Sequence, residues 1–415
     1  MIDFVCFSIN NWEKRRARKQ QFMLHLSLRQ DVGKILYVEP PLNLFRLLFL
    51  SSSELKTQDN RKRWLRALSF KIESPPGGKK IFIFTPLFLF PFSFRSRFIY
   101  NLNLYILLLF IKPKISRLNF ENTVLWLYHP FDYKLLRWFK KRSLAIFDWA
   151  EDWAYYFTEY SFKQRRVVKN LEDRIVQDSD IVFVVSKQLW ERAKKLNDNS
   201  YQILDGTVPE IFANYDRKIP PEIENIFHPM LGYVGTVFKR LDLDLIVALS
   251  EKLPHCSIVL IGNILLPSEE LIKIRRNNVF LLGGREYDEL PNYMMNFDVC
   301  ILPYIPSPYN PPPTKLYDYL ATGKPIVATS FPEMDGFKFK DLIKIAHSED
   351  EFVNYIKEVI QEDPPDLKTR RMQKAKENSW ASRCNEIIAF IQKKMSVQDT
   401  HSQLKHENIA DQASG

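Results

Sequence analysis

The stretch DVCILPYIPSPYNPPPTKLYDYLATGKPIVATSFPE (298–333) combines residue types that suit a phosphate with a sugar beside it. An apolar strand leads through a proline-rich loop into a helix that begins near Thr314, a suitable helix cap. Lys315 lies in the first turn, where exposed backbone amides and the positive end of the helix dipole attract anions. Asp318, one turn later on the same face, can accept hydrogen bonds from vicinal hydroxyls such as those of a ribose. On these residues alone, a solvated helix face explains the pattern equally well.

A second stretch, GYVGTVFKRLDLDLIVALSEKL (232–253), also places cations before a helix. Gly235 permits close backbone approach at the end of a strand, and Lys239 and Arg240 precede the helix start, which suits a diphosphate. A charged surface loop is the alternative. The D-x-D triplet at residues 242–244 is interpreted as a helix cap with a dipole partner, and no metal site is predicted.

Polar side chains also follow two apolar runs of the N-terminal half. His129 follows TVLWLY (123–128), and Asp148 lies near the end of LAIFDW (144–149). A carboxylate at a strand end can stabilise a positively charged transition state or orient an acceptor hydroxyl. Asp148 and His129 are therefore the catalytic candidates, although a lone histidine before a proline is more often structural.

Three cations near the N-terminus, Arg15, Arg16 and Arg18, precede an apolar helix. We predict that they rest on an anionic membrane. A solvated helix face explains them equally well. Residues 1–120 hold 21 Lys or Arg against 7 Asp or Glu, which independently points to an anionic partner for this part of the chain.

Composition and length exclude several classes of protein. With 415 residues, 46% hydrophobic and 26% charged, the chain has room for two or three globular domains. Its four cysteines have no metal-ligand spacing, and no Walker, G-x-G-x-x-G, G-x-S-x-G or H-E-x-x-H motif is present. We expect no signal peptide at the start. The apolar stretch 102–111 has about half the length that crosses a bilayer, so it is expected to be a buried or interfacial helix.

Short apolar runs alternate with helical stretches, which is typical of parallel sheets covered on both faces. The expected strands are 2–8, 34–39, 80–86, 123–128, 144–149, 180–186 and 201–204, and then 230–235, 257–262, 278–283, 298–304, 324–329 and 341–346. We predict an N-terminal domain over 1–214, a linker over 215–229 and a second domain over 230–378. A helix over 379–395 is expected to pack back toward the first domain, and 396–415 to be disordered.

The segment PPPTKLYDYLATGKPIVAT resembles the C-terminal signature of retaining GT-B glycosyltransferases of family 4 type, the glycosyl transferases group 1. It is similar to the subgroup of teichuronic acid biosynthesis glycosyltransferases, whose pattern is N-P-x-K-L-x-E-Y-L-A-x-G-K-P-V-V. The resemblance implies an α/β fold of the GT-B type, in which two Rossmann-like doubly wound domains face each other across a cleft. It also implies a nucleotide-diphosphate sugar as donor and no cofactor for the transfer.

The same resemblance assigns roles to particular residues. Asn310 and Asp318 occupy the positions of two family glutamates that contact the donor sugar and the ribose. Lys239 and Arg240 correspond to the basic side chains that hold the diphosphate. Asp148 falls where many members have a histidine close to the reacting sugar. Asp318 keeps the charge with a shorter reach, whereas Asn310 carries none, so the sequence does not identify the sugar.

We therefore predict a retaining hexosyltransferase that moves a sugar to a glycan or lipid-linked acceptor in cell-surface polysaccharide synthesis. The resemblance also implies that the first loop and helix, which contain Arg15, Arg16 and Arg18, face this acceptor. The expected place of the enzyme is the cytoplasm, peripheral on the inner face of the membrane. The alternatives are a nucleotide-sugar epimerase of the same fold and a noncatalytic protein that binds a membrane surface or nucleic acid. No nucleic-acid motif accompanies the basic residues, so we expect no nucleic-acid partner.

Overall fold

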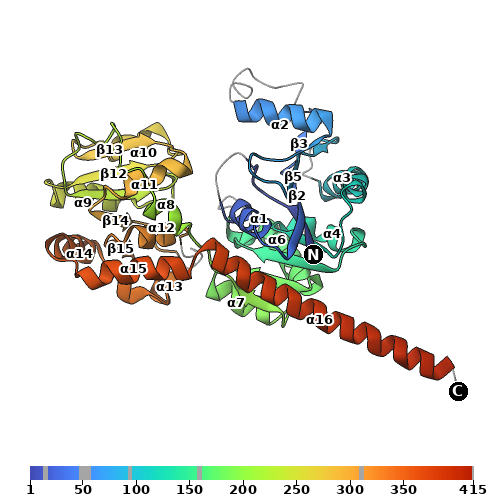
Figure 1. Cartoon of the computed structure of the whole chain (residues 1–415). Coiled ribbons are helices and arrows are strands. Elements are labelled where there is room, and N and C mark those ends of the chain that lie inside the picture. Colours follow the sequence, from blue (N-terminus) through green and yellow to red (C-terminus); the bar gives the residue numbers. More distant parts are fainter. Residues whose placement is uncertain (13–16, 46–57, 92–95, 157–160, 308–312, 414–415) are drawn as a thin grey trace. The chain divides into compact units, whose positions relative to one another are not determined.

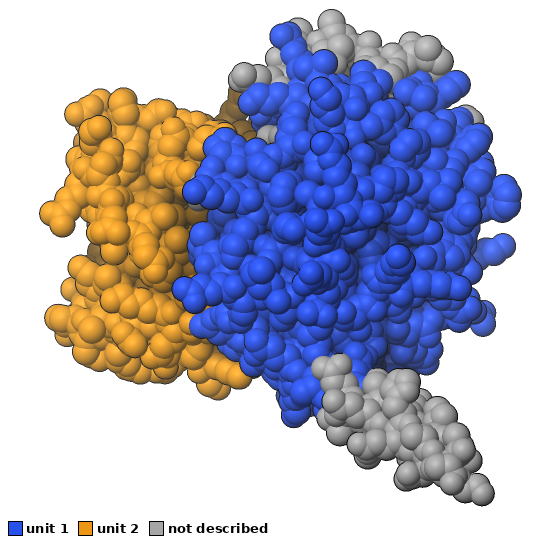
Figure 2. Space-filling view, turned by 45° about the vertical axis from the view of Figure 1, so that its right-hand side comes forward, with its two compact units in different colours: residues 1–204, 383–415 blue, residues 205–382 orange. Residues whose placement is uncertain are grey.

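The chain folds into two compact units (Figures 1 and 2). The computed structural model describes residues 1–12, 17–45, 58–91, 96–156, 161–307 and 313–413. Unit 1 consists of Met1–Leu204 and Arg383–Gly415, and unit 2 of Asp205–Ser382. The polypeptide therefore passes from one unit to the other twice.

Unit 1 is built on an eight-stranded sheet with the order β10-β9-β8-β7-β1-β2-β5-β4. Its strands are β1 (Ile2–Phe7), β2 (Val32–Val38), β4 (Ile72–Glu73), β5 (Ile81–Phe84), β7 (Thr123–Leu127), β8 (Leu144–Trp149), β9 (Ile181–Val184) and β10 (Ser200–Gln202). All neighbours pair in parallel except β4 and β5. Every residue of β1, β7, β8 and β9 is buried, as expected for strands covered on both faces.

The helices of unit 1 fill the connections between these parallel strands. They are α1 (Arg18–Ser27), α2 (Gln58–Ser69), α3 (Arg97–Arg117), α4 (Leu135–Trp138), α5 (Trp153–Tyr156), α6 (Phe162–Asp178) and α7 (Lys187–Lys194), with the 3-10 helix η2 (Pro130–Lys134). Two short strands, β3 (Leu42–Asn43) and β6 (Leu87–Phe88), pair with each other. The order of the large sheet reverses between β1 and β7, which is where doubly wound sheets place ligands.

Unit 2 holds a six-stranded parallel sheet with the order β13-β12-β11-β14-β15-β16. Its strands are β11 (Met230–Val234), β12 (Ser257–Ile261), β13 (Val279–Gly283), β14 (Val299–Leu302), β15 (Ile326–Thr329) and β16 (Lys344–Ala346). Its helices are α8 (Pro209–Ala213), α9 (Leu243–Lys252), α10 (Ser268–Lys273), α11 (Leu290–Met294), α12 (Lys315–Thr322), α13 (Pro332–Asp335), α14 (Glu349–Gln361) and α15 (Pro365–Glu377), with η3 (Tyr287–Glu289) and η4 (Lys340–Leu342). This is the Rossmann strand order, and it reverses between β11 and β14.

Each apolar run that the sequence marks as a strand forms one, but the expected linker over 215–229 packs into unit 2. Ile223 and Ile226 are buried there, and Glu222 forms an ion pair with Arg285. The boundary after residue 214 also moves to 204, because Thr207 pairs with Ser379 in a short parallel bridge of unit 2. Local hydrophobicity gave no sign of either contact.

The C-terminal helix α16 (Trp380–Ala413) extends through the segment that we expected to be disordered (Figure 1). From Arg383 onward the helix belongs to unit 1, where Ile387, Ile388 and Ile391 are buried. The expected disorder is wrong for 396–413, because this segment contains no Pro or Gly and can continue a helix that is already nucleated.

Candidate functional site

Lys315 lies at the edge of the unit 2 sheet where the strand order reverses. It is the first residue of α12, the helix that follows β14. Its Nζ donates hydrogen bonds to the hydroxyls of Tyr233 at 2.9 Å and Tyr304 at 2.6 Å. The same ammonium lies 4.1 Å from the centre of the Tyr233 ring. The side chain is therefore held at the carboxyl ends of β11 and β14.

Gly235 leaves the space that Lys315 occupies. A Cβ added at this glycine would lie 2.1 Å from Nζ of Lys315, and its φ of +147° is a conformation that other residues rarely adopt. The predicted close approach at Gly235 is therefore an approach of the lysine side chain to the backbone. An alanine there would displace the ammonium.

The ammonium of Lys315 keeps its charge available for a ligand. Its hydrogen-bond partners among the described residues are phenol hydroxyls rather than carboxylates. Burial raises the pKa of Tyr233 well above its ordinary value, so this partner is neutral near pH 7. A cation held by neutral groups at the start of a helix suits an anionic ligand.

Lys239 and Arg240 lie in the loop that follows β11, on the same edge of the sheet. The loop is tied to the end of β14, because Ile305 donates its N–H to the carbonyl of Arg240 at 2.9 Å and Leu241 bridges to Tyr304. Lys239 is exposed, whereas Arg240 is half-buried with its guanidinium 5.9 Å from the ring of Phe238. The structure thus brings both cations to the edge that holds Lys315.

Asp318 lies one turn after Lys315 and is partly buried. Its Oδ1 accepts hydrogen bonds from Thr207 at 2.6 Å and from Tyr287 at 3.3 Å. Burial raises the pKa of this carboxyl to about 7, against the opposing effect of the two hydrogen bonds. Both bonds end on one oxygen, so the arrangement leaves Oδ2 as an acceptor for a hydroxyl-bearing ligand.

Thr314 does not cap α12 with its side chain, contrary to our expectation. Its backbone is helical, and its hydroxyl donates to the carboxylate of Asp205. The hydroxyl therefore points toward the segment that follows Leu204, where Thr207 contacts Asp318. Asn310, the other expected donor contact, lies outside the described residues, as do Arg15 and Arg16.

Arg18 is buried in unit 1 and does not belong to an exposed membrane face, which corrects our expectation. Its Nε and Nη2 bind the carboxylate of Asp148 at 2.9 to 3.2 Å, and the guanidinium lies 4.5 Å from the ring of Phe22. Arg18 is 4% exposed and Asp148 is fully buried. Because a buried carboxylate needs a compensating charge, the cation next to an apolar helix turns inward. Asp148 lies at the expected strand end, but there it forms an ion pair with Arg18.

His129 has a structural role in unit 1. Its Nδ1 accepts the N–H of Phe131 at 3.3 Å, which caps the 3-10 helix η2. Its ring packs edge-on against Phe131 and Trp153, with centroids 4.8 and 4.6 Å away. Burial lowers the pKa of His129 to about 4, so the ring is neutral at pH 7. These contacts agree with the structural alternative for this residue.

Several polar residues at these edges were missed by the sequence reasoning. In unit 2 they are Tyr233, Tyr304, Asp205, Thr207 and Tyr287, whose contacts with Lys315, Thr314 and Asp318 are described above. Tyr233 and Tyr304 could have been found from the sequence, because each carries a hydroxyl at the carboxyl end of an apolar run, where such sheets bind ligands. The other three come from distant parts of the chain.

The unit 1 sheet also holds a missed carboxylate, at the end of β2. Glu39 accepts hydrogen bonds from the N–H of Trp12 at 2.7 Å and from the hydroxyl of Thr85 at 2.5 Å. Arg63 of α2 lies 3.5 Å from the same group. Burial raises the pKa of Glu39, and the carboxyl joins the loop after β1 to α2.

The described part of the chain contains no group of three or more metal-ligating side chains that could hold a metal ion. Asp242 instead accepts the N–H of Leu245 at 3.0 Å and caps α9, and Asp244 lies in its first turn. The D-x-D triplet is therefore a helix start, as the sequence analysis expected.

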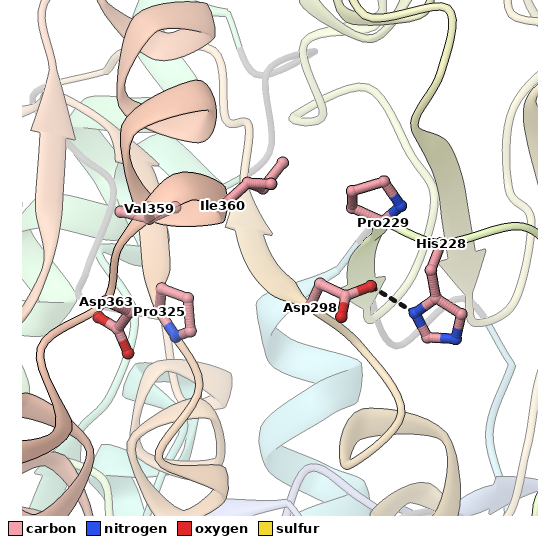
Figure 3. A pocket seen from close by; sticks show the side chains of 7 residues that line it. All are labelled: His228, Pro229, Asp298, Pro325, Val359, Ile360 and Asp363. Carbon is pink, nitrogen blue, oxygen red and sulfur yellow. Dashed lines mark hydrogen bonds and ion pairs between the residues drawn. The ribbon is translucent and has the colours of Figure 1, made fainter.

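A pocket of about 470 Å³ is lined by residues that directly precede β11, β14 and β15 (Figure 3). It therefore lies at the amino ends of these strands, whereas Lys315 lies at the carboxyl ends. In this pocket, Nδ1 of His228 lies 2.5 Å from Oδ2 of Asp298, which also accepts the N–H of Met230 at 2.6 Å. Asp363 is paired with Arg371 at 2.7 Å. Asp298 thus holds the start of β11, and Asp363 fixes the connection between α14 and α15.

Comparison with known proteins finds a family model that matches part of unit 2. Residues 228–362 match the family model of glycosyl transferases group 1. A protein of Bacillus subtilis (strain 168), named for teichuronic acid biosynthesis as the glycosyltransferase TuaH, is 31% identical over 232 residues. That match covers 52% of this chain and 57% of the relative, so it spans little more than half the length of either protein.

Solved structures of similar fold cover nearly the whole chain. Sucrose-phosphate synthase from Thermosynechococcus elongatus has a TM-score of 0.63 and 13% identity, over 96% of this chain and all of that one. The Anabaena protein Alr3699/HepE, solved in complex with UDP, has a TM-score of 0.58 and 13% identity, over 94% of this chain and 99% of that one. At these identities the likeness identifies the fold, which is the two Rossmann-like domains of the GT-B type.

Proposed function

We propose that the chain is a glycosyltransferase with a nucleotide-diphosphate sugar as donor, and the match of residues 228–362 to the family model of glycosyl transferases group 1 supports this proposal. The observation that carries the proposal is the position of Lys315. Its ammonium is held by two phenol hydroxyls at the carboxyl ends of β11 and β14, where Rossmann-like sheets bind nucleotides. The UDP complex of the Anabaena relative supports a uridine donor.

Each part of the donor has a suitable group in unit 2. The diphosphate is assigned to Lys315 and to the basic loop residues Lys239 and Arg240, whose loop is bonded to the end of β14. The ribose hydroxyls are assigned to Oδ2 of Asp318, since its Oδ1 is already occupied by Thr207 and Tyr287. We place the transferred sugar toward Asn310, as the family resemblance implies.

The chemistry that we propose is transfer with retention of the anomeric configuration. As the bond from the sugar to the diphosphate breaks, negative charge grows on the leaving phosphate, and Lys315 with the start of α12 stabilises it. An oxygen of that phosphate then accepts the proton of the acceptor hydroxyl on the same face of the sugar. The protein contributes mainly position and charge.

We assign acceptor binding to unit 1 and propose a glycan or lipid-linked acceptor, used in cell-surface polysaccharide synthesis. The name of the Bacillus relative supports this class of product. The excess of basic residues in the first 120 positions suits an anionic membrane or lipid diphosphate. The proposed location is the cytoplasm, peripheral on the inner membrane face.

The direct test is turnover of a panel of nucleotide sugars by the full chain. We expect release of the nucleoside diphosphate from one or a few donors, beginning with UDP-glucose, the ligand of another solved structure of the Anabaena relative. An epimerase of the same fold would instead change the sugar without an acceptor and leave transfer products absent. A panel that yields neither reaction nor saturable donor binding would contradict the proposal.

Donor binding should depend on pH through Asp318, whose pKa is about 7 because of burial. The ionised carboxylate accepts hydroxyl hydrogen bonds better than the neutral acid, so the donor dissociation constant should rise as pH falls through about 7. The diphosphate diester of a nucleotide sugar does not titrate in this range. Asp205 and Lys315 are the charged groups that act on Asp318.

The measurement is donor affinity by calorimetry between about pH 6 and about pH 8 for the parent and for Asp318→Asn. The asparagine variant should bind weakly with little dependence on pH. If donor affinity depended on pH in the same way in parent and variant, the assignment of Asp318 to the donor site would be wrong.

A further inference from the structure

Helix α3 presents apolar side chains on two opposite faces. Its inner face packs into the core of unit 1 through Leu104, Leu107, Leu108 and Ile111, all of which are buried. On the outer face, Phe98, Tyr105 and Leu109 are 76%, 51% and 50% exposed. With about 3.6 residues per turn, these three positions and Lys112 lie along one side of the helix. Tyr105 lies edge-on to Trp138, with ring centroids 5.9 Å apart, but half of its surface remains exposed. Packing in unit 1 therefore leaves most of this outer stripe uncovered.

By length and composition, α3 is apolar enough to cross a membrane, but its inner contacts hold it on unit 1. An 18-residue stretch of this 21-residue helix has a mean hydropathy of 1.3. However, the buried side chain of Asn103 binds the backbone N–H and the carbonyl of Phe90, both at 3.0 Å. A helix with one side in a protein core and the other side exposed can lie in the plane of a membrane surface.

Helix α2 also has exposed apolar side chains (both helices are labelled in Figure 1). Leu65 and Leu68 of α2 are 69% and 46% exposed, and they are three residues apart on one face. The two helices meet where Phe70, next to the end of α2, stacks on Phe110 of α3 with ring centroids 4.9 Å apart. We call Leu65, Leu68, Phe98, Tyr105 and Leu109 the docking surface.

Basic residues accompany the docking surface. Residues 58–121 hold 12 Lys or Arg against 3 Asp or Glu. Several of these cations are exposed near the apolar side chains, namely Arg61, Lys62, Arg97, Lys112 and Arg117. Exposed apolar side chains bordered by cations match the interface of a bilayer with anionic head groups.

We propose that unit 1 binds an anionic lipid bilayer through this docking surface, with α3 lying in the plane of the interface. The charge argues against a second copy of the chain as the occupant, because a twofold contact would place two strongly positive surfaces against each other. The inference rests on the proposed membrane location and not on sugar transfer. It places the membrane contact on helices α2 and α3, whereas the sequence predicted it at Arg15, Arg16 and Arg18.

The test is sedimentation of the full chain with phosphatidylcholine vesicles, with and without phosphatidylglycerol. The variant F98Q/Y105Q/L109Q replaces three exposed apolar side chains with glutamine, which is a good helix former. The fold should therefore persist, and circular dichroism checks this. The matched control F227Q/L265Q/I272Q changes three side chains of unit 2 that are 81%, 68% and 61% exposed. We expect the parent and the control to bind the anionic vesicles and the α3 variant to bind about tenfold more weakly.

Other outcomes are equally informative. A second variant, K112Q/R117Q, should weaken binding to phosphatidylglycerol vesicles while leaving the apolar side chains intact. Equal binding by the parent and the α3 variant would overturn the proposal, as would a parent that binds neither kind of vesicle. A lipid-free dimer of the parent that the α3 variant loses would identify a second copy as the true occupant. Donor turnover without vesicles reports on the proposed transferase separately, and the α3 variant should retain it.

Discussion

Lys315→Ala should lower donor turnover about a hundredfold, which corresponds to a loss on the order of 3 kcal/mol of transition-state stabilisation. The reason is that Lys315 brings an ammonium to the point where the leaving diphosphate gains charge, held there by Tyr233 and Tyr304. The measurement is kcat and kcat/KM for the donor that the panel identifies. A larger loss in kcat than in affinity is expected if the contact strengthens as the bond breaks.

Lys324→Ala is a suitable control for this experiment. Lys324 lies just beyond the other end of α12, before β15, and is also partly buried. The substitution Lys324→Ala removes one positive charge from unit 2, as Lys315→Ala does, but at the opposite end of the helix. It should therefore leave donor turnover unchanged. If Lys315→Ala kept full donor affinity and turnover, the assignment of the diphosphate to the start of α12 would be wrong.

The second large effect concerns the buried pair of Arg18 and Asp148. Asp148→Ala leaves a guanidinium that is 4% exposed without its carboxylate, and removing one partner of a buried pair typically costs about 3–5 kcal/mol. We therefore expect the free energy of unfolding of unit 1 to fall by about this amount. Urea unfolding followed by tryptophan fluorescence is suitable, since Trp149 is adjacent and fully buried.

The double variant Arg18→Met/Asp148→Leu separates stability from catalysis. It replaces both charges with apolar groups of similar volume, which often restores most of the lost stability. If Asp148 acts on the reacting sugar or the acceptor, the restored protein should remain inactive. Full activity in the double variant would show that the pair is structural.

The sheets were predictable because their signal is local. Runs such as 181–184 are apolar at every position, and a parallel strand covered on both faces requires this pattern. The segment 215–229 was wrongly predicted to be a linker because its prolines and charges are typical of one. Its packing into unit 2 depends on two isolated isoleucines, Ile223 and Ile226, which are buried there. Such sparse contacts carry no periodicity.

Residues of the candidate site were predictable where their role follows from a place at the end of a helix or strand. Lys315 follows from its place at the start of a helix, and Gly235 from its place at the end of a strand. The partners of Asp318 were not predictable, because Thr207 and Tyr287 are distant in sequence and meet it through tertiary packing. Arg18 was misplaced for a similar reason, since its partner lies 130 residues away.

The double passage of the chain between its units has a practical consequence for dissecting the protein. Unit 2 is a single continuous segment, so a fragment spanning 205–382 contains all of its own strands and is the natural choice for isolated donor-binding work. A fragment ending at residue 204 would lack the C-terminal isoleucines that complete the core of unit 1. It would therefore expose to water the apolar side chains that these isoleucines cover. Acceptor studies therefore need the full chain, or a variant in which α16 is joined directly to residue 204 of unit 1.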